Sequence, residues 1–128
     1  MIDHLSLTVR DHARSKAFYT AALAPVGHAR VVELPPSAGE AGGSTGFCHD
    51  DGSDLWIRQG TPVTPPLHLA FRAPSRAAVD AFHAAALAAG GTDNGAPGLR
   101  PQYHPNYYGA FVRDPDGHNI EAVCHDAA

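Results

Sequence analysis

The segment HLSLTVRDHARSKAFYTAALAPVG, residues 4–27, matches the segment HLAFRAPSRAAVDAFHAAALAAGG, residues 68–91, over its full length without a gap. Alanine is frequent in both copies, so the matched alanines carry little weight. The match of His4 with His68, each followed by a leucine, is not explained by composition. A repeat of this size indicates that one structural unit is used twice.

The match continues toward the end of the chain with one residue of slippage. Phe47 falls on Phe111 in the original alignment, and after the slip DGSDLWI, residues 51–57, falls on DGHNIEA, residues 116–122. We therefore expect the 128 residues to form a single domain made of two modules. The expected modules span about residues 1–62 and 65–126.

Each module shows the same order of apolar patterns. An alternating segment predicts a strand, a segment with helical spacing follows it, and three shorter strand-like segments complete the module. In the first module we expect strands at residues 2–9, 28–34, 44–49 and 54–59, with a helix from about residue 11. In the second we expect strands at 67–73, 92–96, 107–112 and 118–124, with a helix after residue 75. The order βαβββ occurs twice, which predicts an α+β fold whose modules form a curved, cup-like mixed sheet.

The two expected helices have recognisable starts and apolar faces. The first begins near Asp11, and Ser75 is expected to be the N-cap of the second. The apolar side chains on or near one face of the first helix are Ala13, Ala17, Phe18, Ala21 and Leu23. Those of the second helix are Ala78, Val79, Phe82 and Leu87.

Composition and charge argue against several classes of protein. An apolar fraction of 44% and a charged fraction of 17% are ordinary for a folded globular domain. A net charge of −4, with no cluster of Lys or Arg, argues against a nucleic-acid partner. No apolar run approaches the length of a membrane span, and the first residues lack the pattern of a secretory signal. We therefore expect a cytoplasmic protein without a membrane partner, in which Cys48 and Cys124 are buried, reduced thiols.

Strand alternation sets the direction of several polar side chains. In the first strand the leucines face the helix, so His4 and Ser6 point to the helix-free face. In the matched strand of the second module, His68 and Arg72 point to the helix-free face for the same reason. Glu121 lies opposite its apolar neighbours in the last strand. If the sheets curl to enclose these faces, His4, His68 and Glu121 lie in one cup.

These features resemble the vicinal oxygen chelate superfamily, which includes glyoxalase I, fosfomycin-resistance proteins, extradiol dioxygenases and bleomycin-resistance proteins. The resemblance covers nearly the whole chain and rests on the paired βαβββ units and on three motifs. The motifs are IDHL at residues 2–5, LHL at 67–69 and DPDGHNIE at 114–121, of which the last is the most specific. The resemblance implies a divalent metal bound by His4, His68 and Glu121.

At the fourth ligand position of glyoxalase I this sequence departs from the pattern. The repeat places Trp56 opposite Glu121, and an indole is not a metal ligand. The resemblance therefore implies a His-His-Glu set rather than a four-ligand glyoxalase I site. Such a set leaves positions open for water or a chelating substrate. A Zn, Fe(II), Mn or Ni ion held there would polarise a carbonyl or activate a bound oxygen nucleophile.

The segment GLRPQYHPNYYG, residues 98–109, carries Gly and Pro residues that predict a loop. In proteins that it resembles, this segment lies at the mouth of the cup, which implies contact with substrate. A surface loop held by aromatic packing is the alternative. The candidates for proton transfer are His104, Tyr103 and Tyr108. The candidates for substrate binding are Trp56, Arg72, Arg100, Tyr107 and Ser6.

The remaining histidines and one low-complexity segment have simpler interpretations. We expect solvated side chains for His12, His28, His83 and His125, and turn-flanking positions for His49 and His118. The segment LPPSAGEAGGSTG, residues 34–46, is expected to be a flexible strand connection that serves as a lid.

Three functions are compatible with these residues. The leading one is a metal-dependent enzyme of the glyoxalase or dioxygenase type, lyase- or isomerase-like, that acts on a small oxygen-bearing substrate. An extradiol-type Fe(II) dioxygenase fits the same ligands, and a ligand-sequestering protein of the bleomycin-resistance kind needs no metal. Fosfomycin-type addition is less favoured because the second module lacks a cluster of Lys, Ser and Arg. The resemblance also implies a homodimer whose sites combine modules of both chains; a site within one chain is the alternative.

Overall fold

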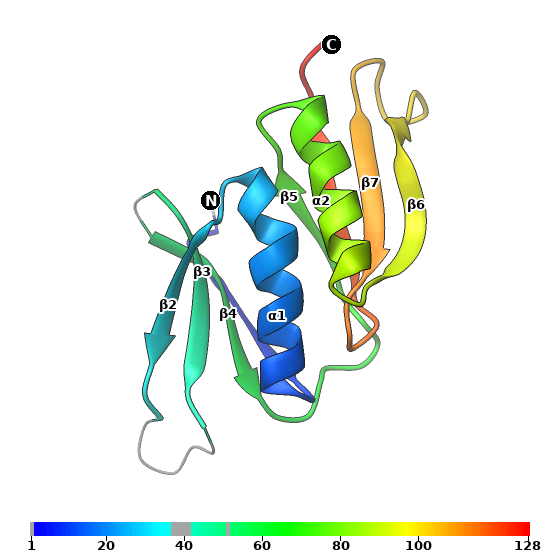
Figure 1. Cartoon of the computed structure of the whole chain (residues 1–128). Coiled ribbons are helices and arrows are strands. Elements are labelled where there is room, and N and C mark those ends of the chain that lie inside the picture. Colours follow the sequence, from blue (N-terminus) through cyan, green and yellow to red (C-terminus); the bar gives the residue numbers. More distant parts are fainter. Residues whose placement is uncertain (1, 37–41, 51) are drawn as a thin grey trace.

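The computed structural model describes residues 2–36, 42–50 and 52–128 and contains two βαβββ modules (Figure 1). It confirms the α+β class and the repeated order of elements expected from the sequence. Part of the 34–46 segment, at residues 37–41, lies outside the described residues, and so does residue 51. Neither helix among the described residues is long and apolar enough to cross a membrane.

The elements begin and end close to the expected positions. The first module consists of β1 (Leu5–Val9), α1 (His12–Leu23), the short 3-10 helix η1 (Ala24–Val26), β2 (Arg30–Leu34), β3 (Ser44–His49) and β4 (Gly52–Gln59). The second consists of β5 (His68–Arg72), α2 (Arg76–Ala88), β6 (Thr92–Leu99), β7 (Tyr108–Arg113) and β8 (Asn119–Cys124). Strand β6 is longer than expected and carries the chain to the start of the 98–109 loop.

Each module forms its own four-stranded sheet. The strand orders are β1-β4-β3-β2 and β5-β8-β7-β6, and in each sheet the first pair is parallel and the other pairs are antiparallel. Ser6 pairs with Trp56 in the first sheet, and Ala70 pairs with Glu121 in the second. Trp56 and Glu121 therefore occupy equivalent places in the two sheets, as the repeat predicted.

Both helices start at side-chain caps. The carboxylate of Asp11 accepts a hydrogen bond from the backbone N–H of Arg14 at 3.1 Å, and the hydroxyl of Ser75 accepts one from Ala78 at 3.1 Å. These bonds satisfy backbone donors that have no partner inside the helix. The expected N-cap at Ser75 is confirmed. At the end of α1 and η1, Gly27 adopts φ 101°, a left-handed conformation that favours glycine.

The buried face of α1 differs from the expected one. Ala13 and Ala17 are exposed, whereas Ser15, Tyr19 and Ala22 join Phe18 and Leu23 in the core. The large aromatic side chains decide the rotation of this helix because they bury far more apolar area than alanines. In α2 the core residues are Val79, Phe82 and Ala86, while Leu87 lies at the surface.

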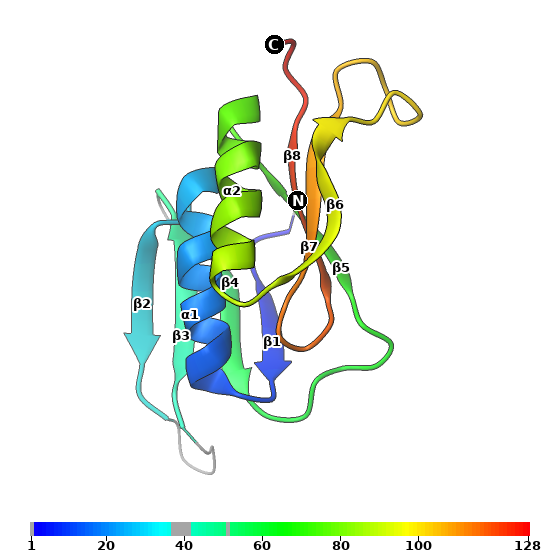
Figure 2. The ribbon, with the colours of Figure 1, turned by 45° about the vertical axis from the view of Figure 1, so that its right-hand side comes forward.

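The two modules are joined through their helices. In both views α1 and α2 lie side by side and cover one face of the sheets, and they are in direct contact (Figures 1 and 2). A single core of large side chains, including Phe18, Phe47 and Phe82, runs through both modules. No strand pairing joins the two sheets within the described residues, so the expected single cup-like sheet is not closed by one chain. Each sheet instead presents its own helix-free face.

Candidate functional site

The helix-free face of the second sheet brings together His68 and Glu121. These residues stand on the paired parallel strands β5 and β8, and the Nε2 atom of His68 lies 2.9 Å from Oε2 of Glu121. The carboxylate accepts the hydrogen bond, because an ionised carboxylate has no proton to donate. Glu121 is only 1% exposed, whereas the His68 side chain is 53% exposed. The pair therefore joins a buried carboxylate to an imidazole that solvent and ligands can reach.

The second oxygen of Glu121 is held by Tyr107, whose hydroxyl donates a hydrogen bond to Oε1. Burial and this bond raise the pKa of the Tyr107 phenol above its ordinary value of 10.0, so it remains a donor at neutral pH. Gly109 leaves the space that the contact needs, since a Cβ atom there would lie 3.1 Å from Oε1. Both oxygens of the buried carboxylate are thus satisfied by protein groups, as buried charges require.

Three more rings surround Tyr107. The ring centroids of Tyr103, His104 and His125 lie 4.8, 5.5 and 5.4 Å from that of Tyr107. His104 and His125 stack on each other and share a hydrogen bond of 2.8 Å between Nε2 and Nδ1. Nδ1 of His104 accepts a hydrogen bond from the backbone N–H of Asn106, so the proton of neutral His104 is on Nε2 and is donated to His125. The loop is held by aromatic packing and also lies beside Glu121.

Arg100 and Phe111 extend the same face. Phe111 pairs with Glu121 across β7 and β8, and its ring centroid lies 6.1 Å from that of His68. The Arg100 guanidinium lies 5.5 Å from the Phe111 ring centroid and donates hydrogen bonds to the carbonyls of Gly98 and Ala96. These two carbonyls fix the guanidinium over the ring and leave further N–H groups for an anion.

Tyr108 and Arg72 lie apart from this group. The Tyr108 hydroxyl donates to Asp80 on α2 at 2.7 Å, and Arg76 of the same helix lies over its ring, so Tyr108 faces the helix side. Arg72 is exposed at the far end of β5 from His68. Its side chain lines a different cavity.

The helix-free face of the first sheet contains the other predicted residues. A cavity of about 360 Å³ is lined by His4, Ser6, Leu34, Ser44, Trp56, Ile57 and Arg58. The indole of Trp56 lies close over Gly46, where a Cβ atom would be only 2.8 Å from the ring. His4 is exposed, and its Nδ1 lies 2.6 Å from the carboxylate of Asp3. This cavity combines a flat aromatic wall with one imidazole and two hydroxyl groups.

One chain does not bring the three predicted metal ligands together. Among the residues that the structure describes, no three His, Cys, Asp or Glu side chains are grouped so that they could hold a metal ion. The donor types nevertheless fit a divalent metal, and His68 Nε2 and Glu121 Oε2 have the separation of neighbouring ligands. Two donors about 2.1 Å from one ion and at right angles to each other are about 3.0 Å apart. The chain places two of the predicted ligands, His68 and Glu121, side by side and leaves the third, His4, in another place.

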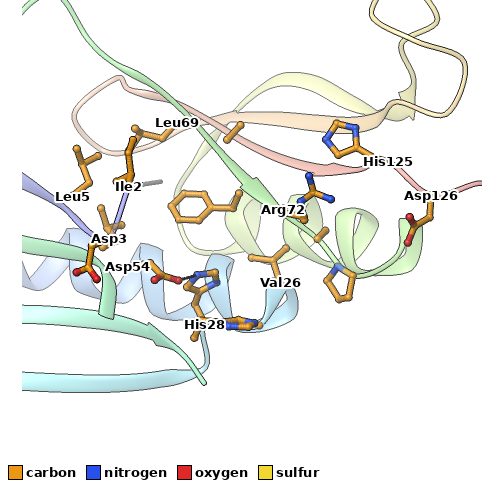
Figure 3. Close-up of a pocket in the computed structure, with 17 residues that line it drawn as sticks. Ile2, Asp3, Leu5, Val26, His28, Asp54, Leu69, Arg72, His125 and Asp126 are labelled. Atoms are coloured by element: carbon orange, nitrogen blue, oxygen red, sulfur yellow. Dashed lines mark hydrogen bonds and ion pairs between the residues drawn. The ribbon is translucent and has the colours of Figure 1, made fainter. Parts of the chain in front are cut away.

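A larger cavity of about 650 Å³ lies between the modules, and sequence patterns gave no sign of it. Figure 3 shows the His28–Asp54 pair on one side of this cavity and Arg72 with His125 on another. His28 was expected to be solvated, but it is only 7% exposed, and its Nε2 lies 2.6 Å from the Asp54 carboxylate. The ring also packs edge-on against Phe71, a contact between modules that the sequence cannot reveal.

His118 and His125 have structural partners of the same kind. His118 is completely buried in the turn before β8, and its Nδ1 accepts a hydrogen bond from the backbone N–H of Leu67. His125 is half-buried against His104 rather than solvated. Both contacts join segments that are far apart in the sequence. Local polarity gave no signal for them.

Comparison with known proteins identifies relatives of the whole chain. A family profile described as the Glyoxalase/Bleomycin resistance protein/Dioxygenase superfamily matches residues 1–122. No curated protein sequence gives a significant match. A glyoxalase/bleomycin resistance protein from Albidiferax ferrireducens has a similar crystal structure, with 33% sequence identity and a TM-score of 0.77. That comparison covers 94% of this chain and 96% of the other.

Two more distant structures share the fold. A glyoxylase/bleomycin resistance protein/dioxygenase domain from Frankia is 24% identical with a TM-score of 0.73, covering 100% of this chain and 93% of that one. The fosfomycin resistance protein FosX from Mesorhizobium loti is 19% identical with a TM-score of 0.68, covering 98% and 92%. At these identities the likeness concerns the arrangement of the chain alone.

Proposed function

Because the chain belongs to the glyoxalase/bleomycin resistance protein/dioxygenase superfamily, we propose that it is a metal-dependent enzyme acting on a small oxygen-bearing substrate. The reaction would be of the lyase or isomerase type. The observation that carries the proposal is the pairing of His68 Nε2 with Glu121 Oε2 at 2.9 Å on the helix-free sheet face. Glu121 is not demanded by the fold there, since its equivalent in the first module is Trp56.

The metal would be held by His68 and Glu121 of one chain and by His4 of a second copy. Within the single chain His4 lies directly before β1 of the first module, whereas Glu121 stands on β8 of the second. A homodimer that places the first module of one chain against the second module of its partner would complete two equivalent sites. A bound Zn, Fe(II), Mn or Ni ion would supply Lewis-acid polarisation of substrate oxygens.

The protein's own side chains would bind the substrate and move protons. Arg100 would pair with an anionic group on the substrate, and Phe111 and Trp56 would contact its apolar part. Ser6 would donate a hydrogen bond from the first module. Tyr103 and His104 remain the candidates for proton transfer, because both stand on the loop beside Tyr107. Tyr108 gains no support from its position, and Arg72 would act only on a substrate that extends beyond the His68–Glu121 pair.

The first test is the metal content of protein purified without chelators and then reloaded with each divalent ion. We expect about one ion per chain in the wild type and a loss of that ion in His4→Ala, His68→Ala and Glu121→Gln. The matched control is His83→Ala on α2, which removes a half-buried histidine bonded to Asp93 and should retain the ion. Failure of the wild type to bind any divalent ion would overturn the proposal. Oxygen uptake with catechol only in the Fe(II) form would instead assign an extradiol dioxygenase.

A mixing experiment tests the shared site. In a mixture of His4→Ala and Glu121→Gln chains, each heterodimer would contain one intact site and one doubly altered site. Random exchange would then restore roughly a quarter of the wild-type metal content, although neither variant binds metal alone. Absence of any restored binding, with subunit exchange confirmed by mass spectrometry, would place the ligands within one chain or exclude the dimeric site.

A second candidate function is ligand sequestration of the bleomycin-resistance kind. It is supported by one observation, that both oxygens of Glu121 already accept hydrogen bonds within the protein. A buried carboxylate satisfied in this way needs no ion for its stability. Under this candidate the wild type would bind small molecules equally well in the presence and absence of a chelator.

A further inference from the structure

We infer that Tyr107 is a positioning residue for the metal site, because its hydroxyl fixes one oxygen of Glu121 and leaves the other for the ion. This inference rests on the proposed function. The sequence pattern placed Tyr107 among the residues that touch substrate. The phenol instead points at the carboxylate, and it binds Oε1 while Oε2 lies against His68.

The two oxygens of a glutamate are chemically equivalent until neighbours distinguish them. A free carboxylate rotates about its last torsion with little preference, so either oxygen can meet a metal. Here the hydroxyl of Tyr107 engages Oε1, and Glu121 is only 1% exposed, so bulk water competes little for that oxygen. The rotation is therefore locked with Oε2 facing His68. Hydrogen bonds of this kind from outside the coordination sphere orient metal ligands in proteins.

Tyr107 is itself held firmly enough to act in this way. Its backbone N–H donates to the carbonyl of His104 at 3.1 Å, and its carbonyl accepts from the N–H of Arg100 at 2.8 Å. The rings of Tyr103, His104 and His125 limit its side chain on several sides. These backbone and ring contacts support the position in which the hydroxyl meets Glu121. A residue that only packed the loop would not need its hydroxyl there.

Gly109 provides an independent sign that this contact is built into the strand. A Cβ atom at Gly109 would lie 3.1 Å from Oε1 of Glu121 and 3.1 Å from Cε1 of Tyr107. The two side chains therefore meet over a position where any larger residue would push them apart. The same strand tolerates a phenylalanine at Phe111, two residues farther on.

The test compares the affinity for Zn²⁺ of the wild type and Tyr107→Phe by calorimetry. Removing the hydroxyl should weaken binding by about 10- to 100-fold, the range found when outer partners of metal ligands are lost. Co²⁺ loading provides a second readout, since its visible spectrum should change with the mode of carboxylate binding. The matched control is Tyr19→Phe, which removes a fully buried phenol that donates to a different carboxylate, that of Asp114, away from this site. Its Zn²⁺ affinity should equal that of the wild type.

A second experiment uses the metal-free protein. Urea unfolding of Tyr107→Phe, Glu121→Gln and the double variant should show strong non-additivity, because the two groups share one contact. Additive losses in the free energy of unfolding would overturn the inference, whatever the measurements of Zn²⁺ affinity show. Unchanged Zn²⁺ affinity in Tyr107→Phe would overturn it while the proposed function stands. If the wild type binds no metal, both the proposed function and the metal-positioning role of Tyr107 are overturned. Non-additive unfolding losses would then show only that Tyr107 and Glu121 contact each other.

Discussion

Gly109 contributes to the direction of the Glu121 carboxylate by leaving space beside it. It carries no functional group, yet its missing side chain provides the space in which Oε1 meets Tyr107. Its φ is not positive, so the backbone does not demand glycine there. The requirement comes from the two neighbouring side chains. At this scale, the site depends on small residues as much as on the titratable ones.

Replacing Gly109 by alanine should therefore damage the site without damaging the fold. The added methyl group would lie 3.1 Å from Oε1, so the carboxylate or Tyr107 must move by a few tenths of an ångström. We expect a roughly tenfold loss of Zn²⁺ affinity, measured by calorimetry, with an unchanged circular dichroism spectrum. Gly52→Ala, at a position with nothing within 4 Å of the added atom, is the matched control. Equal affinities for the two variants would contradict the expectation.

At the level of elements, strand register decides which side chains can share a face. The sequence repeat matched Phe47 with Phe111. In the structure Gly46 pairs with Trp56 and Phe111 pairs with Glu121, so the structural equivalent of Phe111 is Gly46. Phe47 is in the core, and Phe111 lies on the helix-free face. The one-residue slip between the two copies therefore lies before β3 and β7 in the alignment, not after them. A shift of one residue exchanges the two faces of a strand, which is why this detail changes the composition of the site.

Helix starts are more local and can be tested without reference to the site. Ser75→Ala removes the hydroxyl that accepts the N–H of Ala78 at the start of α2. We expect a loss of about 1 kcal/mol in the free energy of unfolding, measured by urea denaturation. Ser75→Asp should restore most of it, because aspartate caps helices equally well. No loss in the alanine variant, or no recovery in the aspartate variant, would show that the cap contributes little here.

At the scale of the whole molecule, the modules are held together by a shared core and by polar contacts across their boundary. Tyr19 of the first module is fully buried, and its hydroxyl donates to Asp114 in the second. Asp114 also accepts the backbone N–H groups of Asp116 and His118 at 3.0 and 2.8 Å. The DPDG turn at residues 114–117 thus also joins the two modules.

Tyr19→Phe should lower the free energy of unfolding by about 1–3 kcal/mol, because a buried carboxylate loses one donor. Burial and the nearby carboxylate of Asp114 raise the pKa of Tyr19 above its ordinary value of 10.0. A raised folded-state pKa gives stability that is fully present below pH 10 and lost as the pH rises above it. Urea titrations at rising pH should therefore show the wild-type advantage shrinking in alkali. Tyr108→Phe, whose hydroxyl bonds to an exposed aspartate, should change stability by less than about 0.5 kcal/mol.

The two modules, the order of their elements and the face that His68 and Glu121 share can be inferred from the amino-acid sequence alone. These properties follow from local periodicity and from a repeat, so strand alternation alone was enough to put His68 and Glu121 on one face. The folded structure was needed to show that Tyr107 holds Glu121, that His28 is buried against Phe71, and that one chain leaves His4 apart from the other two predicted ligands. These contacts join residues that are distant in the chain, and their geometry depends on how helices α1 and α2 pack the modules together. Periodicity within a segment fixes the face of a side chain, but it carries no information about what another module places opposite that face.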